Sequence, residues 1–74
     1  MQDNKNQLKD LGIYFKNLRK AKKLSLSSVA YRSQIDPSTL SRIEKGLIEP
    51  KYFTLKGLIN ALEVNANEIF KDMS

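Results

Sequence analysis

The stretch DPSTLSRIEKG, residues 36–46, carries the side chains with the clearest chemistry in this 74-residue chain. Leu40 and Ile43 are its only large apolar residues, and their spacing marks one narrow stripe along a helix. The other positions carry hydroxyl groups and one long guanidinium: Ser38, Thr39, Ser41 and Arg42. An arginine can pair with the O6 and N7 atoms of guanine, and serine or threonine can reach base edges or phosphates. The stretch therefore predicts a helix face suited to the major groove of DNA.

The same stretch contains signals for both ends of a short helix. Asp36 is a favourable capping residue, and Pro37 suits the first helical position, where its missing N–H costs nothing. Gly46 supplies the left-handed residue that ends the helix. A preceding short helix is expected over about residues 26–32, capped by the serine before it and followed by a four-residue turn, SQID. In such a pair the first helix crosses the DNA backbone and the second enters the groove.

Apolar residues at helical spacing predict three further helices. The first is expected from Leu8 to about residue 21 or 22. Another contains Leu55 and Leu62, but no good capping residue marks its start. The last is expected from a cap at Asn65 to about Lys71. The pattern favours an all-α protein of five short helices, with almost no signal for β-strands.

Length and composition exclude several classes of protein. A chain of 74 residues forms at most one small domain, and we expect a flexible polar arm over residues 1–7 and the domain over residues 8–72. The absence of Cys and His argues against disulfides, structural zinc and Ser–His or Cys–His dyads, so we predict neither an enzyme nor a metal or other cofactor. No apolar run suits a membrane span, and no secretory signal begins the chain. A cytoplasmic protein without a small-molecule ligand is expected.

The net charge of +5 is distributed unevenly along the chain. Residues 1–24 carry seven Lys or Arg against two Asp, whereas residues 47–74 are slightly acidic. A basic half of this kind is typical of a protein with a polyanionic partner. Charge alone leaves a solvated lysine-rich face as an equal alternative.

Three segments, in this order and spacing, resemble the Xre-type (Cro/cI-like) helix-turn-helix family: LRKAKKLS, STLSRIEKG and ALEVNANEIF. The resemblance covers residues 11–70. It implies a compact five-helix, lambda-repressor-like domain with its helix-turn-helix over about residues 25–45. It also implies a homodimer that binds a pseudo-palindromic operator in double-stranded DNA and regulates transcription, as a repressor or an autoregulator.

The resemblance also implies roles for individual residues. The positions that read bases in the family fall on Pro37, Ser38 and Arg42. Candidate contacts to the DNA backbone are Ser27, Ser28, Thr39, Ser41 and Lys45. Arg19 and Glu44 match a family pair that joins the first helix to the recognition helix, and a bidentate Arg–carboxylate contact would orient that helix.

Some positions depart from the family pattern. Leu26 stands where glutamine is frequent, and Gln34 and Glu63 stand where glycine is common, so a left-handed backbone at Gln34 would be strained. Phe53 stands at a place that is usually polar. Aromatic and apolar residues near this end are candidates for the dimer interface, although the last two also suit the core: Tyr52, Phe53, Ile69 and Phe70.

Several roles remain open within and beyond this resemblance. The run VAYRSQID is weakly typical of restriction–modification controllers, and an antitoxin-type regulator or a phage or plasmid repressor is equally compatible. Pro37 and Leu26 at reading positions favour a protein-interaction module that kept the fold without DNA binding. A membrane-surface helix is disfavoured because the apolar face of the first helix is needed for the core.

Overall fold

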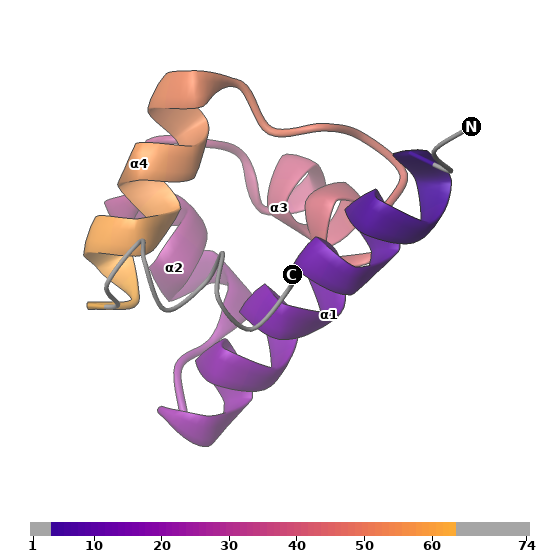
Figure 1. Ribbon diagram of the computed structural model, residues 1–74. Helices are drawn as coiled ribbons and strands as arrows, with labels where there is room; N and C mark the ends of the chain where they lie inside the picture. The colour runs from indigo at the N-terminus through magenta and orange to yellow at the C-terminus, as the bar shows by residue number, and fades with distance from the viewer. Residues whose placement is uncertain (1–3, 64–74) are drawn as a thin grey trace.

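A computed structural model describes residues 4–63, with side chains from Asn6 onward, and this part of the chain forms four α-helices. They are α1 (Asn4–Ala21), α2 (Leu26–Arg32), α3 (Pro37–Glu44) and α4 (Tyr52–Ala61). The α1 and α4 helices lie on opposite sides of the molecule, with α2 and α3 between them (Figure 1). The α3 helix packs against α1 and α2, and α2 also packs against α4. The predicted all-helical fold class is confirmed.

The boundaries of α2 and α3 agree with the sequence prediction, but the start of α1 does not. The helix begins at Asn4, four residues before the expected start at Leu8, so residues 4–7 are helical and are not part of an arm. Apolar spacing marks where a helix packs on the core, and the helix extends further because its polar first residues contain no helix breaker. The helix predicted over residues 65–71 lies outside the described residues.

The core receives side chains from all four helices. The buried apolar residues are Phe15, Val29, Ala30, Leu40, Ile43, Leu58, Ala61 and Leu62. Phe15 is fully buried, and partly buried residues such as Leu11 and Leu18 surround this cluster. Leu40 and Ile43 are the buried stripe of α3, as their spacing predicted. The opposite side of α3 is therefore left for other contacts.

A residue with left-handed backbone follows each of the four described helices. Gly46 has a φ of 73° after α3, and the Leu47 N–H donates to the Arg42 carbonyl at 2.9 Å, which closes the helix end. Gln34 has a φ of 61° in the turn between α2 and α3, so this non-glycine residue adopts the left-handed conformation that was predicted to be strained at this position. Glu63 at 54° and Lys23 at 59° adopt the same conformation, and nothing in the sequence pointed to Lys23.

Gly12 allows α1 to touch the backbone at the end of α3. A Cβ atom at this position would lie 2.4 Å from the carbonyl oxygen of Ile43, a separation that real Cβ atoms do not reach. The close approach therefore requires a residue without a side chain. This close contact fixes the end of α3 against α1, on the side of α3 that is opposite to the exposed face of α3.

Candidate nucleic-acid interface

The exposed face of α3 carries the residues expected to read bases. Leu40 and Ile43 are 0% and 2% exposed, whereas Pro37, Ser38 and Arg42 are exposed. Ser38 and Arg42 are four residues apart, so their side chains lie on the same side of the helix, one turn from each other. Thr39 and Ser41 are half-buried at the margins of this face. The helix thus presents a hydroxyl and a guanidinium together, away from the core.

The candidate backbone contacts lie around α3 and at the start of α2. Lys45 is exposed directly after α3. Ser27 is exposed and Ser28 is half-buried in the first turn of α2. The Ser28 backbone N–H donates to the hydroxyl of the capping residue Ser25 at 3.0 Å, so this N–H already has a partner within the protein. Leu26, at the position where the family often has glutamine, is half-buried and packs against the core.

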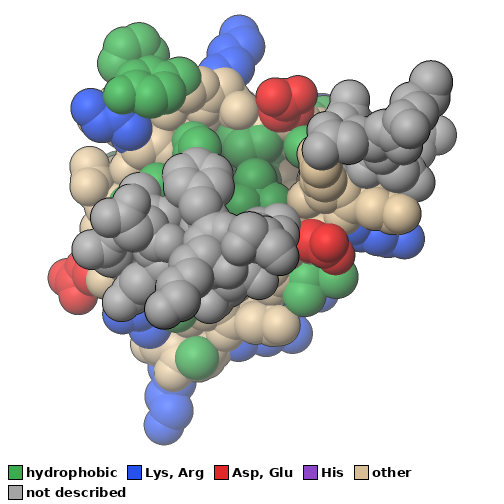
Figure 2. Space-filling model, in the orientation of Figure 1, with side chains coloured by type: hydrophobic (Ala, Val, Ile, Leu, Met, Phe, Trp, Pro, Cys, Tyr) green, Lys and Arg blue, Asp and Glu red, His purple; other side chains and the backbone are tan. Residues whose placement is uncertain are grey.

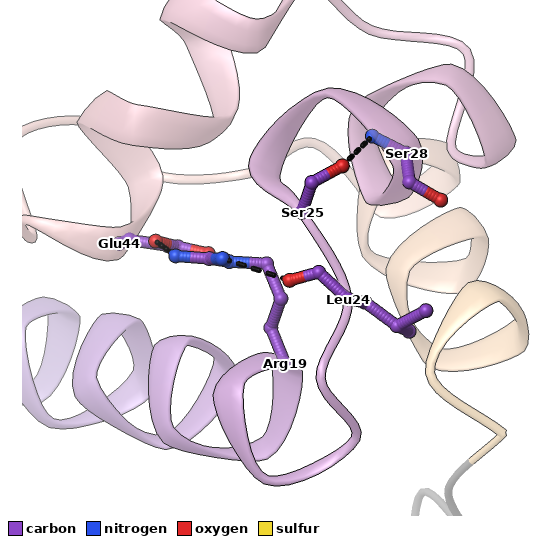
Figure 3. A network of polar contacts seen from close by, with 5 residues as sticks. All are labelled: Arg19, Leu24, Ser25, Ser28 and Glu44. Atoms are coloured by element: carbon purple, nitrogen blue, oxygen red, sulfur yellow. Dashed lines mark hydrogen bonds and ion pairs between the residues drawn. The ribbon is translucent and has the colours of Figure 1, made fainter.

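Arg19 of α1 and Glu44 of α3 form a bidentate ion pair (Figure 3). The Arg19 Nε donates to Glu44 Oε2 at 2.8 Å, and Nη2 donates to Oε1 at 3.1 Å. The Arg19 Nη1 donates to the Leu24 carbonyl at 3.0 Å. The hydrogen bond to Glu44 raises the pKa of the Arg19 guanidinium, against the opposing effect of burial. The side chains of the pair are only 12% and 5% exposed.

This pair fixes the position of α3 relative to α1. The ion pair connects α1 to the last turn of α3. The hydrogen bond from Arg19 to the Leu24 carbonyl also holds the segment between α1 and α2 in place. Arg19 and Glu44 are therefore positioning residues. The role of the Leu24 carbonyl was missed because a backbone acceptor leaves no signature in a sequence.

Two aromatic side chains expected in a dimer interface project from the start of α4. Tyr52 is 67% exposed and Phe53 is 80% exposed. Their rings meet edge to face with centroids 5.2 Å apart, and the Lys56 ammonium lies 5.7 Å from the Tyr52 ring centre. Figure 2 shows hydrophobic side chains standing out from the surface near this end of α4. Ile69 and Phe70, the other two candidates, lie outside the described residues.

The part of the chain that the structure describes contains no helix with the length and apolar character needed to cross a membrane. Within residues 4–63, no three acidic, cysteine or histidine side chains are grouped as a metal site would require.

Comparisons with known proteins place this arrangement in a family. A family model of the helix-turn-helix domain matches residues 10–69. The restriction-modification controller protein C.AhdI from Aeromonas hydrophila is 29% identical, with a TM-score of 0.83 over 88% of this chain and 98% of that protein. The clp gene regulator ClgR from C. glutamicum is 24% identical, with a TM-score of 0.82 over 89% of this chain and 86% of that chain.

A third similar structure includes DNA. A variant of the controller C.Esp1396I bound to its highest-affinity operator site OM is 24% identical, with a TM-score of 0.80 over 89% of this chain and 87% of that chain. At 24% identity, the similarity to the last two structures shows a shared fold. Among curated protein sequences, none matches this chain.

The family match covers most of the chain, so the protein belongs to the helix-turn-helix family. Both α2 and α3, with the turn between them, lie within the matched region. The family, together with the geometry of α3, defines the class: a DNA-binding transcriptional regulator with a regulatory rather than an enzymatic fold.

Proposed function

We propose that this regulator recognises a pseudo-palindromic operator as a homodimer, with one α3 helix in each of two successive major grooves. The observation that carries the proposal is the division of α3 into a buried stripe, Leu40 and Ile43, and an exposed face with Ser38 and Arg42. Arg42 would pair with guanine and Ser38 with a neighbouring base edge. Pro37, at the tip of α3, would make an apolar contact with a base, such as a thymine methyl group.

The backbone contacts supply most of the affinity in this proposal. Lys45 neutralises a phosphate, and four hydroxyl groups add neutral hydrogen bonds to phosphate or sugar: Ser27, Ser28, Thr39 and Ser41. Each neutralised phosphate releases counterions, so binding weakens as salt rises. The protein acts in the cytoplasm by occupying DNA, without a catalytic step or a cofactor.

Tyr52 and Phe53 are the proposed centre of the dimer interface. Two large exposed aromatic rings in contact with each other form the type of apolar patch that a second copy of the chain can cover. A dimer places its two recognition helices about one helical turn of DNA apart, roughly 34 Å. Ile69 and Phe70 remain candidates for the same interface.

A controller of a restriction–modification system is the specific role that the comparisons support best. The controller C.AhdI is 29% identical to this chain, and the matched region covers 98% of that protein. We infer that the protein binds DNA upstream of its own gene and regulates transcription there, with repression as the expected outcome.

The proposal is tested by fluorescence anisotropy with labelled duplexes from the protein's own upstream region and with shuffled duplexes of the same composition. We expect preferential binding to the native sequence, two chains per duplex, and an observed association constant that falls linearly on a log–log plot against salt. Lys45→Ala is expected to lower the slope of that plot by about 1. Equal binding to native and shuffled duplexes would refute the proposal of sequence-specific recognition.

The dimer interface is tested separately by sedimentation equilibrium. Phe53→Ser removes an exposed ring, so it should shift the equilibrium toward monomer without loss of helical content. Ile13→Ser, which also replaces an exposed apolar residue but on α1, serves as the control. A dimer that is equally stable with serine at position 53 would show that the interface lies elsewhere.

A further inference from the structure

A shallow hollow of about 520 Å³ lies beside the N-terminal end of α3. It is lined by Tyr31, Gln34, Ile35, Asp36 and Thr39. Asp36 directly precedes Pro37 and Ser38, so the hollow adjoins the tip of the helix that is proposed to enter the major groove. None of the base-reading roles discussed above uses this hollow.

Among the residues that the structure describes, Asp36 is the only acidic one that lines the hollow. It occupies the N-cap position of α3 with extended backbone angles, φ −72° and ψ 147°, yet its carboxylate accepts no hydrogen bond from the helix. The equivalent residue of α2, Ser25, does accept such a bond. The expectation that Asp36 caps α3 is therefore correct for its position and wrong for its side chain. Within the described residues its exposed carboxylate is not used by an ion pair either.

A free carboxylate at the tip of a DNA-reading helix restricts what that tip can approach. Phosphate oxygens and the acceptor atoms of guanine and thymine repel it, and the available donors in the major groove are the amino groups of cytosine and adenine. In adenine the amino group lies beside the N7 acceptor, whereas cytosine presents only its N4 donor. A C·G pair with cytosine toward Asp36 is therefore the partner that leaves the carboxylate satisfied.

We propose that this hollow is a further base-reading site and that Asp36 is its specificity-determining residue, with the carboxylate accepting a hydrogen bond from N4 of a cytosine. The inference rests on the proposed function, because it requires α3 to lie in the major groove. Tyr31 also lines the hollow and is 86% exposed, so its side chain is accessible to DNA at the same place. The carboxylate selects in two ways, by bonding to cytosine and by repelling bases that present acceptors.

The experiment is a selection of bound duplexes from random double-stranded DNA, with the wild-type protein, Asp36→Asn and the control Asp10→Asn. Asparagine is as good an N-cap as aspartate, so the variant should retain the fold, which thermal unfolding verifies. Asp10 is an exposed residue of α1, and its replacement removes the same charge away from the tip of α3.

We expect wild type and Asp10→Asn to select cytosine at one position in each half-site, with a preference over thymine of about 5- to 150-fold. Asp36→Asn should lose that preference and keep the preference for the guanine read by Arg42. Unchanged base preferences with Asp36→Asn, or tighter binding to all sequences alike, would overturn the inference while leaving the proposed function intact. A wild-type protein that selects no sequence would overturn both.

Discussion

Removal of Glu44 is expected to destabilise the protein strongly, because it leaves the nearly buried guanidinium of Arg19 without its charged partner. Loss of one member of a buried ion pair costs about 3–5 kcal/mol. Arg19 is 12% exposed and keeps its hydrogen bond to Leu24, so the lower end of that range, about 3 kcal/mol, applies to Glu44→Leu. In a domain of this size, each 1 kcal/mol lowers Tm by about 4–8 °C, so the expected fall is about 12–24 °C.

The assay is urea unfolding of wild type, Glu44→Leu, Arg19→Met and the double variant. A double-mutant cycle isolates the interaction between the two side chains. We expect each single variant to lose stability and the double variant to recover most of it, because a buried ion pair can be replaced by apolar side chains at little cost. Single losses below about 1 kcal/mol that simply add in the double variant are typical of an exposed pair, and they would refute the reasoning.

Three substitutions test the backbone and the core by urea unfolding. Gly12→Ala should destabilise by several kcal/mol, about as much as other severe steric substitutions, since its Cβ would lie 2.4 Å from the Ile43 carbonyl oxygen; a small change would show that α1 can move away from α3. Gln34→Gly should stabilise by about 1 kcal/mol by relieving the positive φ, and a loss would show that the glutamine side chain contributes more than the strain costs. Ser33→Ala should also stabilise by about 1 kcal/mol because the buried Ser33 Oγ has no hydrogen-bond partner among residues 4–63, and a loss of stability would reveal one.

The two short helices α2 and α3 could be predicted from sequence because local signals mark both starts and the end of α3. Ser25 and Asp36 mark the starts of α2 and α3, and Gly46 marks the end of α3. The start of α1 was not predicted, because the apolar spacing begins only at Leu8; Asp3 and Asn4 are capping-type residues in the sequence that could have marked the earlier start. Gly12 shows the same limit, because a glycine within a helix gives no information about which backbone approaches it.

Within the candidate site, the exposure of Ser38 and Arg42 follows from the apolar stripe on α3, which is a local property. The pairing of Arg19 with Glu44 joins residues 25 positions apart and was anticipated only from the family resemblance. The hollow could not be anticipated, because it depends on how the turn packs beside α3. Local capping rules even predicted the opposite for Asp36, a carboxylate occupied by its own helix.

The most direct test of sequence reading by the exposed face of α3 compares wild type, Arg42→Ala and Arg42→Lys. The affinity of each for a selected operator and for a shuffled duplex is measured at two salt concentrations. We predict that Arg42→Ala loses about 1–3 kcal/mol on the operator and much less on the shuffled duplex. Arg42→Lys should retain the salt dependence but lose most of the specificity, because lysine lacks the planar bidentate geometry of arginine. An operator-to-shuffled affinity ratio that stays unchanged in Arg42→Ala would contradict the account.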